Sequence, residues 1–134
     1  LLDVTSGVLN LAIDLMGKRN RWSEVASEMG TYVRDAGFSV VESFVGHGIG
    51  RLLHEAPSVP NYGKPAKGQL LREGMCLAVE PMITLGNHET KVLADGWTVS
   101  TVDGSLAAHF EHTIAVTPRG PEILTVLDET RRTA

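Results

Sequence analysis

The chain has 134 residues, enough for one domain with its own core and too few for two ordinary domains. It carries 12 Lys and Arg against 16 Asp and Glu, and it lacks a basic cluster, which argues against direct binding of nucleic acid. No apolar run approaches the ~20 residues of a membrane-spanning helix, so no membrane association is expected. The single cysteine, Cys76, fits a reducing compartment, and we expect a cytoplasmic protein.

The first third of the chain predicts two amphipathic helices. Apolar residues recur at helical spacing in residues 3–16 and again in residues 24–36. Gly17 follows the first segment, and Gly37 stands where a left-handed residue commonly ends a helix. Ser23 precedes the second segment and is the predicted N-cap of that helix. Packing into a core explains both apolar stripes.

The rest of the chain predicts strands. Residues 38–45 are rich in β-branched and aromatic side chains, and the continuous apolar run 75–79 suits a strand buried on both faces. Asp95-Gly96 stands between two strand-like runs and indicates a two-residue hairpin, and residues 106–117 predict one long strand. These elements predict a single α+β unit in which two helices pack on a mainly antiparallel sheet.

Two glycine- and proline-rich segments are predicted to be loops. Residues 46–50 form a glycine-rich loop around His47, and the prolines and glycines from Pro57 to Gly68 exclude regular structure there. We expect the structured unit to span residues 1–127 and the polar segment 128–134 to be a frayed tail.

A histidine and two glutamates are the candidate metal ligands. Glu80 ends a buried apolar run and Glu111 lies inside a strand-like run, where a carboxylate is costly unless it is paired or bound to a metal. Two such carboxylates brought together repel unless a cation lies between them. His47 adds a nitrogen donor, and this donor set suits first-row transition metals. A salt bridge with a nearby Arg or Lys is the alternative for either glutamate alone.

The other histidines and Trp97 have open roles. His54 could be a second ligand, a donor to substrate or a solvated loop residue. His109 shares a strand face with Glu111, so it could support the ligands through a hydrogen bond or simply be exposed. His112 points to the opposite face and is predicted to be structural. Trp97 packs on the hairpin or forms part of a pocket wall.

Five short motifs follow one another in a fixed order: Gly46-His47-Gly48-Ile49-Gly50, His54-Glu55-Ala56-Pro57, Glu80-Pro81-Met82, Asp95-Gly96-Trp97-Thr98-Val99 and Phe110-Glu111-His112-Thr113. In this order and at these intervals they resemble the type I methionine aminopeptidases. The resemblance extends from about residue 1 to residue 125. It implies the pita-bread (creatinase/aminopeptidase) fold, of which this chain would be the C-terminal half, with two helices on a mainly antiparallel, curved sheet.

The resemblance also implies residue roles around two divalent metal ions, which in the family are Co, Mn, Fe or Zn. His47 and Glu80 would bind one ion, and Glu111 would bridge both. His54 would be the catalytic residue that hydrogen-bonds the scissile carbonyl oxygen or the tetrahedral intermediate, and it would contact substrate. Leu53, which stands where many members carry Phe, and Trp97 would line the pocket for the methionine side chain.

The implied reaction is hydrolysis of the first peptide bond of a nascent chain by a metal-bound hydroxide, which releases methionine. The implied partners are peptides with an N-terminal methionine and ribosome-associated nascent chains. Two aspartate ligands of the family lie in its N-terminal half, so that half would be needed and this segment alone would be inactive. A proline-directed aminopeptidase or prolidase of the same fold, and a non-catalytic pita-bread module that binds peptides, are the alternatives.

Overall fold

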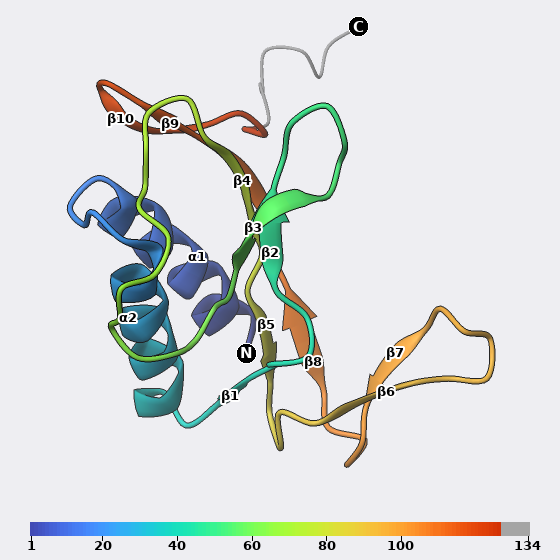
Figure 1. Cartoon of the computed structure of the whole chain (residues 1–134). Helices are drawn as coiled ribbons and strands as arrows, with labels where there is room; N and C mark the ends of the chain where they lie inside the picture. The colour runs from blue at the N-terminus through green and yellow to red at the C-terminus, as the bar shows by residue number, and fades with distance from the viewer. Residues whose placement is uncertain (127–134) are drawn as a thin grey trace, which may run out of the picture.

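Two helices cover one side of a set of antiparallel strands (Figure 1). The computed structural model describes residues 1–126, so the predicted tail 128–134 lies outside the described residues. Among the described residues every pair of strands is antiparallel, and no helix combines the length and apolarity needed to span a membrane. The expected arrangement of two helices on a mainly antiparallel sheet is confirmed.

Helices α1 (Leu2–Met16) and α2 (Trp22–Asp35) pack against each other and supply much of the core. The apolar stripes predicted from their spacing point inward, as the burial of Val8, Val25 and Met29 shows. Strand residues close the other side of this core; the buried ones include Val59, Leu77, Val79, Ile83 and Ile114. The two helices therefore fix the back of the sheets and leave their other side free.

Ser23 is not the N-cap of α2, so this prediction is wrong. The helix begins at Trp22 and its N-cap is Arg21, whose backbone N–H donates to Glu24 Oε2 at 3.2 Å. The Ser23 hydroxyl instead donates to the carbonyl oxygen of Ala66 at 2.8 Å, far along the chain. The Ser23 side chain therefore makes a tertiary contact with the loop at Ala66 instead of the helix cap that the local sequence predicted. The predicted left-handed Gly37 is confirmed, with φ of +82°.

The strands form three sheets. The five-stranded sheet has the order β10-β9-β4-β2-β3, and the three-stranded sheet has the order β1-β5-β8. A two-stranded hairpin, β6-β7, completes the set. The strands span Ser39–Val40 (β1), Gly46–Gly48 (β2), Glu55–Val59 (β3), Cys76–Val79 (β4), Met82–Thr84 (β5), Thr90–Val92 (β6), Val99–Thr101 (β7), Ala107–His109 (β8), His112–Thr117 (β9) and Gly120–Ile123 (β10).

Three sequence predictions about strands and loops are wrong. The glycine-rich segment 46–50 is not a loop, because its first residues form β2, an inner strand between β3 and β4. Pro57 lies within β3, where it is tolerated because β3 is the edge strand of its sheet. The predicted strand 38–45 is reduced to Ser39–Val40. Short tertiary pairings, rather than local composition, decide these boundaries.

The predicted long strand 106–117 is broken in two. Strand β8 pairs with β5 and places Met82 opposite His109, whereas β9 pairs with β4 and places Val79 opposite His112. Residues 80–81 and 110–111 fill the interruption between these two paired segments. Counting inward from both pairs puts Glu80 opposite Glu111. This interruption, which we call the sheet break, is where the candidate carboxylates meet.

The β6-β7 hairpin extends away from the rest of the molecule (Figure 1). The hairpin itself was predicted, but its two-residue turn is wrong because residues 93–98 separate the paired strands. The Asp95 carboxylate organises this loop by accepting hydrogen bonds from the Thr98 hydroxyl and from the backbone N–H groups of Trp97 and Thr98. These bonds, led by that of the Thr98 hydroxyl, lower the pKa of Asp95.

Candidate metal site

Glu80 lies at the centre of the candidate site, at the end of β4. Its side chain is 15% exposed, and its two carboxylate oxygens face two different imidazoles. Oε1 is 3.5 Å from Nε2 of His47, and Oε2 is 3.3 Å from Nε2 of His109. The Glu80 backbone carbonyl also accepts a hydrogen bond from the Asn61 amide at 3.2 Å. The carboxylate therefore lies between imidazole nitrogens from β2 and β8, at a fixed point of the main chain.

His47 is positioned by the two glycines beside it. A methyl group on Gly46 would collide with the carbonyl oxygen of Ala78 in β4, and one on Gly48 would collide with that of Ala56 in β3. Neither glycine has a positive φ, so backbone conformation does not explain why glycine is needed at these positions. The close approach of the neighbouring strands does. The backbone of β2 is thus packed tightly on both sides, which holds the imidazole in place.

The hydrogen bonding of His47 favours a cation beside it. Its Nδ1 lies 2.9 Å from the carbonyl oxygen of Gly48, so Nδ1–H is the donor in the neutral ring. The lone pair on Nε2 then faces an oxygen of Glu80, and two lone pairs repel unless a cation lies between them. In metal sites a ligating histidine commonly donates its other N–H to a backbone carbonyl in this way.

His54 lies against His47, although no feature of the sequence predicts that the two residues share one rigid face. Their ring centroids are 4.2 Å apart and the rings are inclined by 47°. Glu55 folds the connecting loop by accepting a hydrogen bond from the Leu52 backbone N–H at 2.8 Å. The His54 side chain is exposed, so it is available to a molecule that approaches the site.

The sequence predicted that Glu111 lies inside a buried strand. In the structure it lies in the sheet break instead. It is exposed, and one oxygen of it lies within 4.8 Å of ligand atoms from both Glu80 and His109. Like charges directly opposite each other across paired strands are destabilising, so these two carboxylates need a compensating positive charge. The expected convergence of Glu80 with Glu111 is present.

His109 is closer to the carboxylates than its sequence position suggested. Its side chain is 46% exposed. Its contact with Glu80 is the main cause that raises the pKa of His109, the negative charges of Glu80 and Glu111 add to this, and partial burial opposes it. Alternation along the strand had put His109 and Glu111 on one face, but the sequence did not indicate that Glu80 lies between them.

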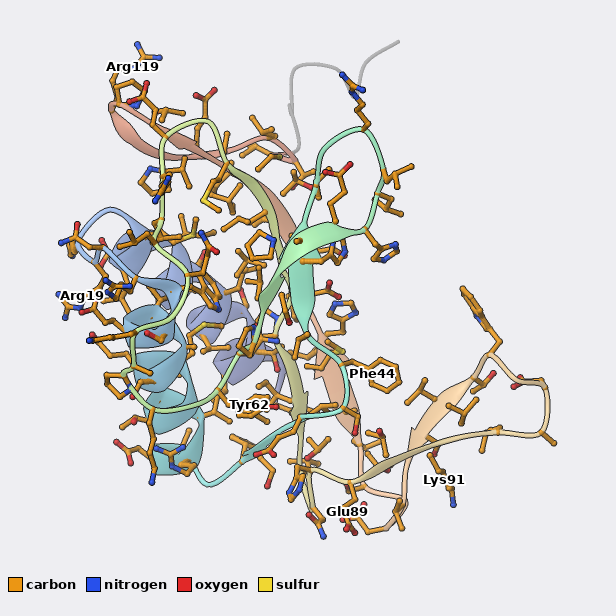
Figure 2. All side chains as sticks on the ribbon, in the orientation of Figure 1. Arg19, Phe44, Tyr62, Glu89, Lys91 and Arg119 are labelled. Carbon is orange, nitrogen blue, oxygen red and sulfur yellow. The ribbon has the colours of Figure 1, made fainter. Side chains whose placement is uncertain are left out.

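Leu53 and Trp97 are not gathered around the carboxylates. Leu53 is 67% exposed in the loop before β3, and Trp97 is 87% exposed in the loop of the β6-β7 hairpin. A pocket of about 340 Å³ opens beside His109, and its wall includes Phe44 and Val99. Figure 2 shows the Phe44 side chain extending from the sheets.

His112 does not take part in this group of residues. Its Nδ1 lies 2.8 Å from the Thr125 hydroxyl.

The residues at the sheet break suit a divalent transition metal. Carboxylate oxygens and neutral imidazole nitrogens are the donors such ions take, and they converge here from β2, β8 and the two crossings of the sheet break. A cation would neutralise the opposed carboxylates and satisfy the lone pair of His47. Among the described residues the only group of three or more such ligand atoms within 4.8 Å is Glu80, His109 and Glu111.

The sequence and the fold of this chain are similar to those of known proteins. Residues 1–118 match metallopeptidase family M24. A methionine aminopeptidase of Clostridium perfringens is 55% identical over 108 residues, an alignment that covers 81% of this chain and 43% of that protein. The crystal structure of methionine aminopeptidase from Thermotoga maritima superposes with a TM-score of 0.91 at 49% identity, covering 95% of this chain and 51% of the other.

A more distant neighbour shares the fold alone. The prolidase from Pyrococcus furiosus has a TM-score of 0.65 at 19% identity and covers 94% of this chain and 32% of its own. The expected pita-bread fold is confirmed by these structural neighbours. The chain spans about half the length of the methionine aminopeptidases that it matches. With most of its residues inside the family match, the chain belongs to metallopeptidase family M24.

Proposed function

We propose that this chain is the C-terminal half of the catalytic domain of a metal-dependent aminopeptidase that removes the N-terminal methionine of polypeptides. The observation that carries this proposal is the pair of opposed carboxylates, Glu80 and Glu111, with the imidazole of His47 beside them. The similarity to methionine aminopeptidases supports the substrate class.

In this proposal His47 and Glu80 would hold one divalent ion, and Glu111 would be a ligand of that ion and of a second one. Nitrogen and oxygen donors of this kind accept Co, Mn, Fe or Zn. Ions bound here would activate water and polarise the scissile carbonyl. The protein contributes the fixed positions of the donors, which its tightly packed glycine-flanked strand and the sheet break provide.

His54 is proposed to bind substrate and to act in catalysis. Its exposed ring lies against His47 with a centroid distance of 4.2 Å, and it can donate a hydrogen bond to the scissile carbonyl oxygen beside the ligands. Such a donor lowers the barrier when it strengthens as negative charge develops on that oxygen. Leu53 and Trp97, both largely exposed, are proposed to form walls of the methionine pocket once further protein covers them.

The proposed partners follow from the substrate. They are peptides with an N-terminal methionine, including nascent chains at the ribosome, and the N-terminal half of the catalytic domain, which completes the ligand set. We place the activity in the cytoplasm, for which the single, unpaired Cys76 is the supporting observation.

The test is Glu111→Ala in the protein that carries the whole catalytic domain. Because Glu111 is proposed to contact both ions, we expect the bound metal and methionine release to be lost together. Metal content by mass spectrometry of the purified protein and release of methionine from a Met-Ala-Ser peptide measure the two effects. Glu122→Ala removes an exposed carboxylate on β10 and is the matched control. A Glu111→Ala protein with two ions and normal kcat would overturn the assignment.

A further inference from the structure

The proposed function gives no role to one imidazole of the site, that of His109, although its ring nitrogen lies within 4.8 Å of ligand atoms of Glu80 and Glu111. His109 ends β8 directly before the sheet break, and the pairing of β8 with β5 fixes its backbone opposite Met82. Its Nε2 points at Glu80 Oε2 from 3.3 Å, on the side of the carboxylate away from His47. The carboxylate of Glu80 therefore has an imidazole nitrogen against each of its oxygens.

We propose that His109 is itself a metal ligand, which binds through Nε2 the same divalent transition-metal ion as Glu80 and Glu111. The proposal rests on the metal site proposed above and adds a protein nitrogen to it. Because His47 is proposed to share the ion with Glu80, this chain would supply four donors to one ion: His47, Glu80, Glu111 and His109.

The spacing of the donor atoms fits one ion. With bonds of about 2.0 to 2.2 Å to nitrogen and oxygen, two ligands of a tetrahedral ion lie roughly 3.3 to 3.5 Å apart. The 3.3 Å between His109 Nε2 and Glu80 Oε2 meets this value. The Glu111 oxygen, within 4.8 Å of the other two, needs a modest side-chain rotation to join them. Glu111 is exposed, so that rotation is not blocked by packing.

A hydrogen bond alone is the competing role for His109. In that role the ring donates Nε2–H to Glu80 and only orients the carboxylate. Glutamine separates the two roles, because its amide can donate the same hydrogen bond but is a poor ligand for transition metals beside imidazole. The side chain is 46% exposed, so glutamine can be accommodated there without disturbing the core.

The experiment compares the zinc-loaded protein that carries the whole catalytic domain with its His109→Gln and His109→Ala variants. X-ray absorption at the zinc edge counts the imidazoles bound to the metal, and competition with a chelator gives the zinc affinity. His88→Gln, which removes an exposed imidazole from a turn between β5 and β6, is the matched control. Circular dichroism and thermal unfolding confirm that each variant is folded.

We expect both His109 variants to lose one bound imidazole and to bind zinc more weakly by more than roughly 100-fold, beyond the 10- to 100-fold typical of an outer hydrogen-bond partner. An unchanged imidazole count, or zinc affinity restored in His109→Gln but not in His109→Ala, would show that His109 only orients Glu80, and the proposal would be overturned. One result would overturn the role of His109 but keep the proposed function. In that result Glu111→Ala loses zinc, whereas both His109 variants keep every bound imidazole. Absence of zinc from the unmodified protein would overturn the proposed function as well.

Discussion

At the scale of single residues, the alternation of glycine and histidine in β2 positions a side chain. Gly46 and Gly48 allow the backbones of β4 and β3 to come close on either side, and His47 projects from the strand between them. A residue with a Cβ atom at either glycine would force the neighbouring backbone to move. Glycine normally weakens a strand, so its presence here marks a place where backbone approach is required.

Gly48→Ala is expected to destabilise the protein by about 2 kcal/mol, in the range of overpacked cores, because the new methyl group meets the main chain of Ala56. Gly50→Ala is the matched control. Its methyl group would meet the carboxylate of Glu55, which can rotate away, so a smaller loss is expected. Urea unfolding measures both. Equal stability of the two variants would show that strand spacing around His47 is relaxed.

The chemistry of the site was predictable residue by residue, but its geometry was only partly so. Glu80 at the end of an apolar run and Glu111 in a second run were unusual enough to be chosen as ligands. The place of His109 beside Glu80 was not predictable, because residues 106–117 have continuous strand character. The break in that strand is produced by pairing with two different strands, which composition does not encode.

At the scale of elements, the start of α2 holds down the long loop that connects β3 to β4. The Trp22 ring N–H donates to the carbonyl oxygen of Pro60 at 2.7 Å, and the Ser23 hydroxyl donates to that of Ala66. Arg21 reaches the carbonyl oxygen of Gly68 at 2.8 Å. The backbone N–H of Trp22 also donates to the carbonyl oxygen of Gln69 at 2.9 Å, so both side chains and main chain attach the loop to the start of the helix. This explains how a proline- and glycine-rich segment is ordered without secondary structure of its own.

Ser23→Ala is expected to loosen this loop and leave the helix intact. The Ser23 hydroxyl both donates to the Ala66 carbonyl and accepts from the Ala66 backbone N–H, and both lost hydrogen bonds are exposed, so the free energy of unfolding should fall by only about 1 kcal/mol. Limited proteolysis should show faster cleavage within residues 60–70, and far-ultraviolet circular dichroism should show unchanged helix content. Ser27→Ala, on the same helix, is the control. A loss of helix content without faster cleavage would instead support a capping role for Ser23.

The base of the β6-β7 hairpin is anchored by Asp103. Its carboxylate accepts hydrogen bonds from the backbone N–H of Asn87 at 2.7 Å and from that of Ser105 at 2.9 Å. These bonds, of which that from Asn87 has the largest effect, lower the pKa of Asp103 to about 2. The carboxylate thus ties together the two chain segments that enter and leave the hairpin.

This anchor gives the hairpin a defined pH dependence. The folded carboxyl has a pKa of about 2 against 3.8 for the unperturbed group, so its stabilisation is complete above pH 3.8 and is lost as the pH falls towards 2. We expect the amide proton shift of Asn87, followed by NMR, to titrate with a midpoint near the lower value. Asp103→Asn should abolish this titration. A midpoint near 3.8 would show that the hydrogen bonds do not hold the folded carboxylate.

At the scale of the whole molecule, several large apolar side chains of the strand region are in contact with water. Besides Leu53 and Trp97, the exposed apolar side chains of the loops and strands after β2 include Leu52, Val99, Leu106 and Phe110. Apolar surface of this kind usually marks a contact with other protein. Its extent agrees with a chain that spans about half the length of its relatives.

The 134-residue chain purified alone is expected not to release methionine from peptides. Its described residues provide His47, Glu80, Glu111 and, by our inference, His109, but not the two aspartate ligands that the resemblance places in the other half. A Met-Ala-Ser peptide incubated with the chain and added Mn or Co gives the measurement, with the protein that carries the whole catalytic domain as the positive control. Sustained methionine release by the chain alone would contradict the expectation.

The broad architecture was predictable from the sequence and the sheet boundaries were not. Helical spacing is a local property, so both helices were placed within one or two residues of their ends. Strand limits depend on partners far away in the chain. The inner strand at Gly46–Gly48 is short and rich in glycine, and nothing in its own composition distinguishes it from a loop.

The sheet break has one further consequence, which concerns chain length. Two residues cross it on each side, 80–81 on one and 110–111 on the other, between segments whose pairing is fixed at both ends. One residue added to either crossing would shift the alignment and turn a carboxylate away from its counterpart, because side chains alternate between faces. Insertions and deletions at these four positions are therefore expected to be poorly tolerated.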